Sequence, residues 1–434
     1  MVEIIEVKTK KQRKQFVDFP TKLYEGNPYY VHALRGDELG IFTPKKNVSF
    51  DECDIVFYLA MRGKEVVGRI CGILQKVYNL KTGTKRVRFG RFDFIDDIEV
   101  PRALLGAVEE WAKSKGMDTV HGPLGFNDLE REGLLIEGFD RLATFEANYN
   151  YPYYKDLIEK CGYEKEIDYI SSRVELPKEP NERAKRLADA IMKRYNLKIA
   201  KAKNIREYLN KYKDGIFEVL DEAYGDLYGV IPYNERLKKS IIDQFKMVIN
   251  MNYIISVLDE NDRVVAFGFA LPELAHAVQK SKGRLFPFGV FRILYARNHG
   301  SVADFGLIGV RKEYANKGLP AIMINYIVEE AKNVGVATVE GNLTLEDNHH
   351  MLQLYKNFDN VERHKRFRCF VKKLYEEKVE ESEKKKSGAK KTSKPKTATK
   401  KSTAKKSTTK KASTKKKTTT KKTTKATSTK KSTK

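Results

Sequence analysis

Long hydrophobic runs are absent from this chain of 434 residues. A membrane-spanning helix needs about 18 or more consecutive apolar residues, so we expect no transmembrane segment. The first residues, MVEIIEVKTKKQRKQF, hold no apolar block followed by a small-residue cleavage site. We therefore also expect no signal peptide.

Cysteine is scarce, and the four cysteines stand far apart without a C-x-x-C pair. That spacing argues against a disulfide framework and against a structural zinc site. His121 and the adjacent His349 and His350 have no other metal-binding residues beside them in the sequence, so we predict no metal site. We expect a protein of a reducing, cytoplasmic setting.

Acidic residues are missing from residues 384–434, which contain 22 lysines. Only +3 of the net charge of +25 therefore belongs to the rest of the chain. With no aromatic residue and little apolar surface to bury, this segment is predicted to be disordered. It resembles the tails of linker histones and bacterial histone-like proteins. As a polycation it favours nucleic acid or an anionic membrane surface, which would imply association with the nucleoid or a membrane surface; a solubilising tail without a partner is the alternative.

The chain contains an internal repeat. AKSKGMDTVHGPL (residues 112–124) and AKNVGVATVEGNL (residues 331–343) share one pattern, A-K-x-x-G-x-x-T-V-x-G-x-L, at an offset of 219. The same offset pairs Pro101 with Pro320. Proline near a helix start and glycine just past a helix end are typical of helix boundaries. Each proline is therefore predicted to open a helix that ends at the first glycine of the pattern, with a strand after it.

Further segments repeat in the same order. GKEVVGRICGIL matches NDRVVAFGFALP, LIEKCGY matches LYKNFDN, and DLEREGLLIEGFDRLATFEANY is an insertion in the first copy. Each copy is predicted to be a mixed α/β sheet with helices on its faces, and the shared order favours a duplication. We predict two modules, residues 1–180 and 181–376, followed by the disordered tail 377–434.

The second copy carries a motif, IGVRKEYANKGLPAIMI, that resembles the acyl-CoA motif of the GNAT (GCN5-related N-acetyltransferase) family. In that motif a strand precedes Q/R-x-x-G-x-G/A at a helix start. Gly318 matches the first glycine, whereas Ala315 and Pro320 depart from the pattern. The resemblance implies two tandem GNAT-like modules. It implies that acetyl-CoA or a longer acyl-CoA is bound in the second, by Val310, Asn316, Lys317 and Gly318.

A second segment, LEDNHHMLQLYKNF, resembles the family pattern N-x-x-(A/M)-x-x-L-Y. The resemblance implies that Asn348 contacts the pantetheine arm and that Tyr355 protonates the departing CoA thiolate. From the residues alone, Asn348 could instead cap a helix, and Tyr355 could be a core residue. Asp359 stands where the family usually has glycine. The first copy has Ile158 at the tyrosine position and no glycine before its helix, so it is predicted to lack a cofactor site.

At finer grain, FPTKLYEGNPYYV, VVGRI, VHGPLGF and YNYPYYKDLIEKCGYEKEIDY resemble a bacterial group related to bacterial ceramide synthases. The resemblance covers residues 1–375. It implies N-acylation of a long-chain amine from acyl-CoA.

Two carboxylates are candidate general bases. In VATVEGNLTLEDN, strand alternation places Glu340 on a polar face, where it either deprotonates the acceptor amine or forms hydrogen bonds at an interface between modules. Asp304, on the preceding strand, is the second candidate base, and a polar strand-edge residue is its alternative. Strand N–H groups at Gly309–Arg311 are expected to stabilise the oxyanion.

The segment GRLFPFGVFRILYARN (residues 283–298) combines large apolar residues with arginines. It is predicted to form either an apolar groove for an acyl chain or lipid acceptor, or an ordinary buried helix and turn.

Three classes of function remain open. The first is an acyl-CoA-dependent N-acyltransferase acting on an amine, without metal and without a covalent intermediate. The second is a catalytically silent GNAT-like scaffold. The third is a nucleoid-associated protein that acts through its basic tail.

Overall fold

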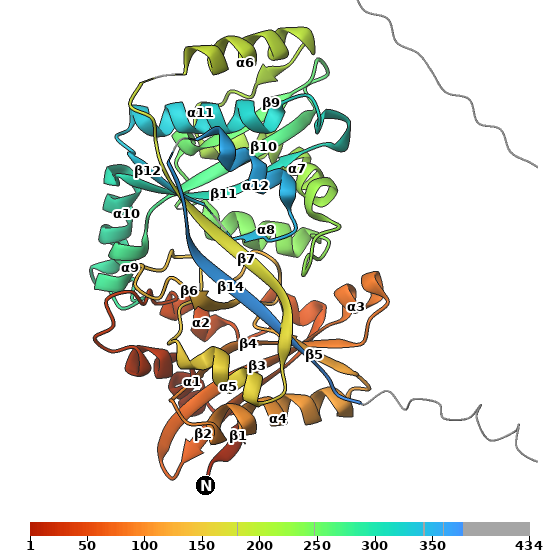
Figure 1. The fold of residues 1–434 in the computed structure, drawn as a ribbon, viewed down its shortest axis with the longest axis vertical. Helices are drawn as coiled ribbons and strands as arrows, with labels where there is room; N and C mark the ends of the chain where they lie inside the picture. Colours follow the sequence, from red (N-terminus) through yellow and green to blue (C-terminus); the bar gives the residue numbers. More distant parts are fainter. Residues whose placement is uncertain (180, 247, 342, 359, 376–434) are drawn as a thin grey trace, which may run out of the picture. The chain divides into compact units, whose positions relative to one another are not determined.

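Strand-forming segments from both repeats join in one mixed sheet in the computed structural model of the chain (Figure 1). The structure describes residues 1–179, 181–246, 248–341, 343–358 and 360–375. These described residues form a single compact unit. The predicted disorder of residues 377–434 and the role of Asp359 lie outside the described residues.

Within the described residues the sheet has fourteen strands. Their order is β1-β2-β3-β4-β5-β14-β7-β12-β11-β10-β9-β8, with β6 paired to β14 and β13 paired to β7. The strands of the first half are β1 (Glu3–Glu6), β2 (Cys53–Arg62), β3 (Glu65–Gln75), β4 (Arg86–Phe94), β5 (Thr119–Gly122), β6 (Leu134–Glu137) and β7 (Glu164–Glu175). Those of the second half are β8 (Lys198–Ile199), β9 (Ile254–Leu258), β10 (Val264–Pro272), β11 (Val302–Val310), β12 (Thr338–Gly341), β13 (Thr344–Leu345) and β14 (Val361–Lys373).

Helices flank the sheet. In the first half they are α1 (Lys10–Leu23), α2 (Arg35–Gly40), α3 (Lys76–Thr82), α4 (Glu99–Ser114) and α5 (Tyr153–Lys160). In the second half they are α6 (Glu182–Arg194), α7 (Ile205–Tyr224), α8 (Glu235–Phe245), α9 (Ala275–Lys280), α10 (Gly289–His299), α11 (Leu319–Asn333) and α12 (His349–Leu354).

Each half buries both faces of its own part of the sheet. In the first half, α4 and α5 pack against β3, β4 and β5, and α1 and α2 pack with β2 and β3 in a separate cluster. In the second half, α11 packs against β9 to β12, while α7 and α8 form a separate cluster with alternate residues of β9 and β10. The same layer order therefore occurs twice, and the prediction of an α/β chain built from two mixed-sheet repeats is confirmed.

The predicted repeat has equivalent elements in the structure. β5 and β12 begin and end at positions related by the offset of 219, and α4 and α11 end at positions related by it. Gly116 and Gly335, which follow these two helices, both have positive φ values, 72° and 91°. An L-residue is strained in that region, so glycine is the natural residue to end each helix.

The last strands of the two halves cross over. β14, from the end of the second half, pairs with β5 of the first half, while β7, from the end of the first half, pairs with β12 of the second. β7 and β14 also pair with each other along most of their length, as Figure 1 shows for the two long strands near the centre of the view. Each half therefore completes the sheet of the other, and the boundary predicted at residue 180 stays a prediction.

Candidate active site

An opening in the sheet separates the parallel strands β11 and β12. They pair only from Val302 to Phe305 opposite Thr338 to Gly341. Beyond Gly341 the chain follows β7 as β13, whereas β11 continues to Val310 along β10. The edge of β11 after Phe305 therefore lacks a neighbouring strand on the β12 side in the described part of the chain. We call this gap the β11–β12 opening.

A β-bulge marks the start of the opening. Gly268 of β10 pairs with Ile308 and Ala270 pairs with Phe305, so Phe269 stands opposite two residues, Gly306 and Leu307. A Cβ on Gly306 would come within 2.6 Å of the Phe269 ring, which accounts for glycine at this position. Bulges of this kind redirect the backbone and are common beside active sites.

Gly318 begins α11 in a left-handed conformation, with φ 79°. No side chain caps the helix, and Pro320 lies in the first turn. The backbone N–H groups of Gly318, Leu319 and Ala321 donate to no acceptor among the described residues. Free N–H groups at the positive end of a helix dipole form a site that suits an anion.

The other predicted cofactor-binding residues surround this loop. Asn316 is exposed. The Lys317 ammonium lies 4.1 Å from the ring centroid of Tyr314 and 4.8 Å from that of Tyr195. Val310 is the last residue of β11, on the strand that leads into the loop. Their roles in binding stay predictions.

The backbone N–H of Arg311 donates to the Val265 carbonyl at 2.9 Å. Because this N–H already has an acceptor, it is a poor candidate for stabilising an oxyanion.

Tyr355 points to the closed end of the β11–β12 opening. A Cβ on Gly341, the last residue of β12, would lie only 2.2 Å from the Tyr355 hydroxyl, so the two residues are in close contact. Burial raises the pKa of the Tyr355 phenol above its usual value, against a smaller effect of its hydrogen bond with Thr344. Asn348 caps α12, since its side chain accepts the N–H of Met351 at 3.2 Å. Its contact with a cofactor stays a prediction.

Asp304 and Glu340 are neighbours on the two parallel strands. Asp304 is largely buried, and its Oδ1 atom has no hydrogen-bond partner among the described residues. Burial raises the pKa of Asp304 well above its usual range, and the charge of Glu340 raises it further. Asp304 thus takes up a proton more readily than an ordinary carboxylate does.

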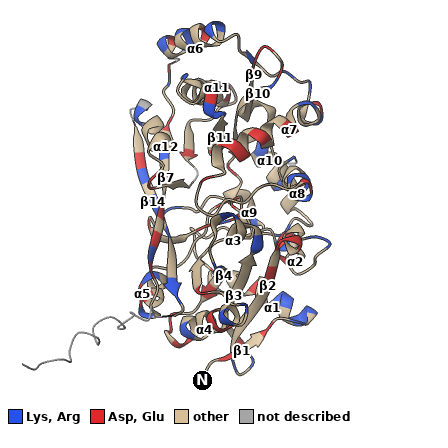
Figure 2. Ribbon diagram, turned by 90° about the vertical axis from the view of Figure 1, so that its right-hand side faces the viewer, with Lys and Arg blue, Asp and Glu red and all other residues tan. Residues whose placement is uncertain are grey.

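Glu340 has the opposite character. The Lys365 ammonium of β14 forms an ion pair with Glu340 Oε1, and His364 Nε2 lies 3.3 Å from the same atom. Although burial alone would raise it, these partners lower the pKa of Glu340 to about 2. β14, whose many basic residues are blue in Figure 2, is one of the two exchanged strands. The ion pair therefore links β12 to an exchanged strand. A carboxylate so firmly ionised is a weak proton acceptor, and its pairing fits the interface interpretation.

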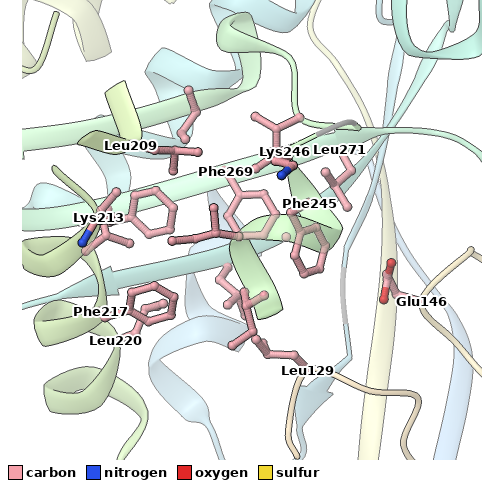
Figure 3. Close-up of a pocket in the computed structure, with 18 of the residues that line it drawn as sticks. Leu129, Glu146, Leu209, Lys213, Phe217, Leu220, Phe245, Lys246, Phe269 and Leu271 are labelled. Atoms are coloured by element: carbon pink, nitrogen blue, oxygen red, sulfur yellow. The ribbon is translucent and has the colours of Figure 1, made fainter. Parts of the chain in front are cut away.

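An apolar pocket that opens to solvent lies against the same sheet layer (Figure 3). Its walls come from α7, α8, β10 and β11 and include Phe217, Phe245, Phe269 and Leu271. Gly306 and Leu307, at the bulge, also line it. The pocket therefore adjoins the start of the β11–β12 opening.

Two carboxyl groups from the first half reach this pocket. Asp128 accepts a hydrogen bond from Tyr233 at 2.7 Å through Oδ2, while its Oδ1 is buried without a partner in the described chain. Glu146, labelled in Figure 3, makes no ion pair or hydrogen bond with described side chains, and burial raises its pKa to about 7. The charge of Glu146 also raises the pKa of Asp304, so electrostatics connects the pocket to the candidate base. Both residues lie in the insertion of the first copy, where no motif singled them out.

Tyr224, at the end of α7, is a second residue that sequence reasoning missed. Its hydroxyl donates to the carbonyl of Ile308 at 2.9 Å and lies 3.2 Å from the N–H of the same residue. It therefore satisfies the backbone of β11 just past the bulge. A ligand that pairs with β11 at Ile308 has to displace this hydroxyl.

The equivalent position in the first half has different chemistry. Strand register places Arg88 beside His121, as it places Asp304 beside Glu340 in the second half. α4 starts without a glycine, and the Asp97 carboxylate accepts the N–H of Glu99 at 2.9 Å. An acid at this helix start repels phosphate, which supports the prediction that the first half lacks a cofactor site.

Comparison with known proteins identifies the fold. No family model matches the chain. A tandem GNAT protein from the clavulanic acid biosynthesis pathway, solved without AcCoA, superposes with a TM-score of 0.50 at 12% identity, covering 87% of this chain and 99% of its own. This chain has the tandem GNAT fold. The prediction of two tandem GNAT-like modules is thereby confirmed at the level of fold.

Two curated relatives match the tandem GNAT chain along most of its length. Protein YghO of Escherichia coli (strain K12) is 28% identical over 379 residues, 84% of this chain and 94% of its own. Bacterial ceramide synthase of Caulobacter vibrioides (strain NA1000 / CB15N) is 27% identical over 393 residues, 86% of this chain and 98% of its own. The predicted resemblance to the ceramide synthase-like group thus appears in the sequence comparison.

The described residues contain neither a membrane-spanning helix nor a metal-binding cluster. No helix in the described residues has the length and apolar character needed to cross a bilayer. Among the same residues, no three or more His, Cys, Asp or Glu side chains gather as they would around a metal ion.

The segment 283–298, for which a buried helix and turn was one prediction, is only partly buried. Ile293 of α10 is buried, but Phe286, Phe288, Phe291 and Tyr295 are each at least 66% exposed. The buried-helix interpretation is therefore wrong for the aromatic side chains, which face solvent.

Proposed function

We propose that this chain is an N-acyltransferase that moves an acyl group from acyl-CoA directly to an amine. The observation that carries the proposal is the β11–β12 opening, which has free helix N–H groups at one side and an apolar pocket with carboxyl groups at the other. The GNAT fold and the curated relative named as a ceramide synthase support N-acyl transfer in general. The dependence on acyl-CoA and the nature of the acceptor are our proposals.

The residues at the opening fit acyl-CoA. The N–H groups of Gly318, Leu319 and Ala321 would hold the pyrophosphate, and Lys317 would add a positive charge. Asn348 and Val310 would contact the pantetheine arm as it enters between the strands. The bulge at Gly306 would then receive the thioester end.

The amine acceptor would enter from the apolar pocket. An aliphatic tail fits walls of Phe217, Phe245 and Phe269, and an ammonium group would find a counter-ion in Glu146. An acceptor with a long apolar chain and a primary amine has both features. Hence we propose a long-chain, sphingoid-type amine as the acceptor class.

Transfer would need one base and one acid. Asp304 would take a proton from the ammonium, because its raised pKa makes it a better base than Glu340. The free amine would attack the thioester carbonyl, forming the C–N bond and breaking the C–S bond. Tyr355 would give its proton to the departing thiolate and recover one from the new amide nitrogen. Amine plus thioester thus becomes amide plus thiol.

Calorimetric titration of the full chain with acetyl-CoA and with a long-chain acyl-CoA tests the cofactor part. We expect saturable binding of at least one of them. Binding of neither would refute the proposed function.

A catalytically silent GNAT scaffold is the alternative class. It would keep the acyl-CoA site and lack transfer, so binding without thiol release in the presence of a range of long-chain amines would favour it. The departures at Ala315 and Pro320 motivate this alternative.

The basic tail supplies a separate candidate activity. We propose that residues 384–434 bind polyanions, nucleic acid before lipid, by counterion release. A truncation at residue 380 should lose DNA retention, with a shallower salt dependence than the full chain. Equal retention and equal salt dependence would refute this role and the nucleoid association that it implies.

A further inference from the structure

An exposed aromatic surface covers the loop and helix that join β10 to β11. Large hydrophobic side chains are exposed at nine described positions, and four of them fall within residues 286–295. The exposed fractions are 80% for Phe286, 66% for Phe288, 67% for Phe291 and 66% for Tyr295. We call these four residues the aromatic patch. Clustered exposed aromatics cost free energy in water and usually mark an interaction surface.

The spacing of the residues explains why the patch faces outward. Phe288, Phe291 and Tyr295 follow one another at i, i+3 and i+7, which places them on one face of α10. Gly289 and Ile293, on the other face, are buried. α10 stands at the left of the view in Figure 1, at the periphery of the second half. The helix is thus anchored through one side and presents its aromatic side to solvent.

The chain segment that carries the aromatic patch is basic, although one of its lysines, Lys282, pairs with Glu25 at 3.6 Å. The segment from Leu274 to Ala303 contains no aspartate or glutamate. It contains five basic residues, Lys280, Lys282, Arg284, Arg292 and Arg297. Arg284, which precedes the aromatic positions, and Arg292, which lies between Phe291 and Tyr295, are exposed. Aromatic rings with interleaved Lys and Arg, free of acids, have the chemistry of an interfacial membrane anchor.

The segment is joined to the active-site strands. β10 and β11, which it connects, both line the apolar pocket. Asp304 follows the segment directly in the sequence. A surface bound through the aromatic patch would therefore be connected to the pocket through two short stretches of backbone.

We propose that the aromatic patch docks the protein on an anionic lipid bilayer, with the rings inserted at the headgroup level and the basic residues on the lipid phosphates. Three observations carry the proposal: the exposure of four aromatic side chains, their common face on α10, and a flanking charge of one sign. The proposal is independent of the tail and of the acyl-transfer chemistry.

Co-sedimentation of the full chain with phosphatidylcholine vesicles containing phosphatidylglycerol tests this. The basic tail also attracts anionic vesicles, so the decisive arm is at about 0.5 M NaCl, where charge attraction is strongly screened. We expect the wild type to retain part of its binding there. The double variant F288S/F291S should reduce the bound-to-free ratio about tenfold, because it removes two inserted rings. Leu80→Ser, which removes an exposed hydrophobic side chain elsewhere, should have no effect.

A second measurement keeps the proposal testable should the double variant fold poorly. The chain has a single tryptophan, so Phe288→Trp adds one fluorophore within the aromatic patch. Its emission should shift to shorter wavelength when vesicles are added, since the ring leaves water. An unshifted spectrum, or equal sedimentation of wild type and F288S/F291S at about 0.5 M NaCl, would overturn the proposal.

Two other occupants of the surface would also overturn it. A dimer that F288S/F291S dissociates, observed by analytical ultracentrifugation without vesicles, would identify a second copy as the partner. Loss of single-stranded DNA binding in the same variant, with vesicle binding unchanged, would identify a nucleic acid.

Discussion

Asp304 and Glu340 lie opposite each other on adjacent parallel strands, yet their pKa values are shifted in opposite directions. Lys365 and His364 hold Glu340 in the ionised form, and the resulting negative charge helps to raise the pKa of Asp304. One carboxylate thus tunes the other. Of the two carboxyl groups, Asp304 is therefore the one whose protonation state changes more readily near neutral pH.

Asp304→Asn should leave acyl-CoA binding intact and lower turnover by about 100-fold or more, because it removes the general base. The variant keeps the shape of the side chain, so a change in the melting temperature is not expected to accompany the loss. Steady-state rates with a long-chain amine, together with a calorimetric titration of acyl-CoA, check both parts. A variant that retains full turnover would eliminate Asp304 as the base.

Glu340→Gln should act mainly on stability. It leaves the Lys365 ammonium buried with its counter-charge removed, which costs about 3 kcal/mol in comparable buried pairs. Because the folded pKa of Glu340 is lowered to about 2, its ion pair stabilises the wild type above its ordinary pKa, and this contribution is lost as the pH falls from about 4.5 to 2. Urea unfolding across this range should show a shallower decline in the variant. A variant as stable as the wild type at neutral pH would contradict the assignment.

Glu146 should give the acceptor affinity a pH dependence. Burial raises its pKa to about 7, so the carboxyl is neutral below that pH and becomes a counter-ion for an ammonium above it. The Michaelis constant for the amine should therefore fall as the pH rises through about 7. Glu146→Gln should remove this step, while Glu235→Gln, at an exposed carboxylate of α8, should preserve it. If the Michaelis constant of Glu146→Gln changed with pH as much as that of the wild type, Glu146 would have no part in acceptor binding.

Much of the fold was predictable from the sequence, because duplication makes local signals appear twice. The offset of 219 located the ends of α4 and α11 and both strands that follow them. The strand exchange was not predictable. β7 and β14 end equivalent repeats and have the same local sequence pattern. Each strand could therefore pair with the sheet of either half. The choice depends on contacts made only in the folded chain.

The candidate site was predictable only where a motif or an alternation pattern exists. Alternation placed Glu340 on a polar face, but it did not reveal that Lys365, on a strand that does not pair with β12, neutralises it. Asp128 and Glu146 lie in an insertion, and Tyr224 ends an ordinary amphipathic helix. Asp128 and Glu146 matter because they line a pocket, and Tyr224 matters because it bonds to the edge of β11. Both features form only when distant segments pack together, so the sequence does not reveal them.

Gly318→Val should abolish acyl-CoA binding. A side chain here is strained at φ 79°, and its Cβ would lie 3.1 Å from Ile191 of α6, so the helix start and its free N–H groups would move. Gly335→Val is the matched control, since it imposes the same kind of strain at the other end of α11, at φ 91° with open space around the Cβ. Calorimetry should show binding in the control alone. If the two variants bound acyl-CoA with equal affinity, the pyrophosphate would not bind at the start of α11.

Tyr355→Phe should lower turnover and leave acyl-CoA affinity nearly unchanged, since it removes the proton donor to the thiolate and keeps the ring. Thiols of low pKa need little protonation on leaving, so the loss should grow with the basicity of the leaving thiol across a series of acyl thioesters. Tyr375→Phe, at an exposed tyrosine, provides the control. A uniform loss along the series would assign Tyr355 a positioning role.

The most direct test of the central claim is product analysis with the full chain, an acyl-CoA and a long-chain primary amine. Mass spectrometry would follow the amide, and a thiol reagent would follow free CoA in the same reaction. We predict that amide and thiol appear in equal amounts and that both disappear in Asp304→Asn. Saturable acyl-CoA binding with neither product, across acyl lengths and amines, would contradict it and identify a silent GNAT scaffold.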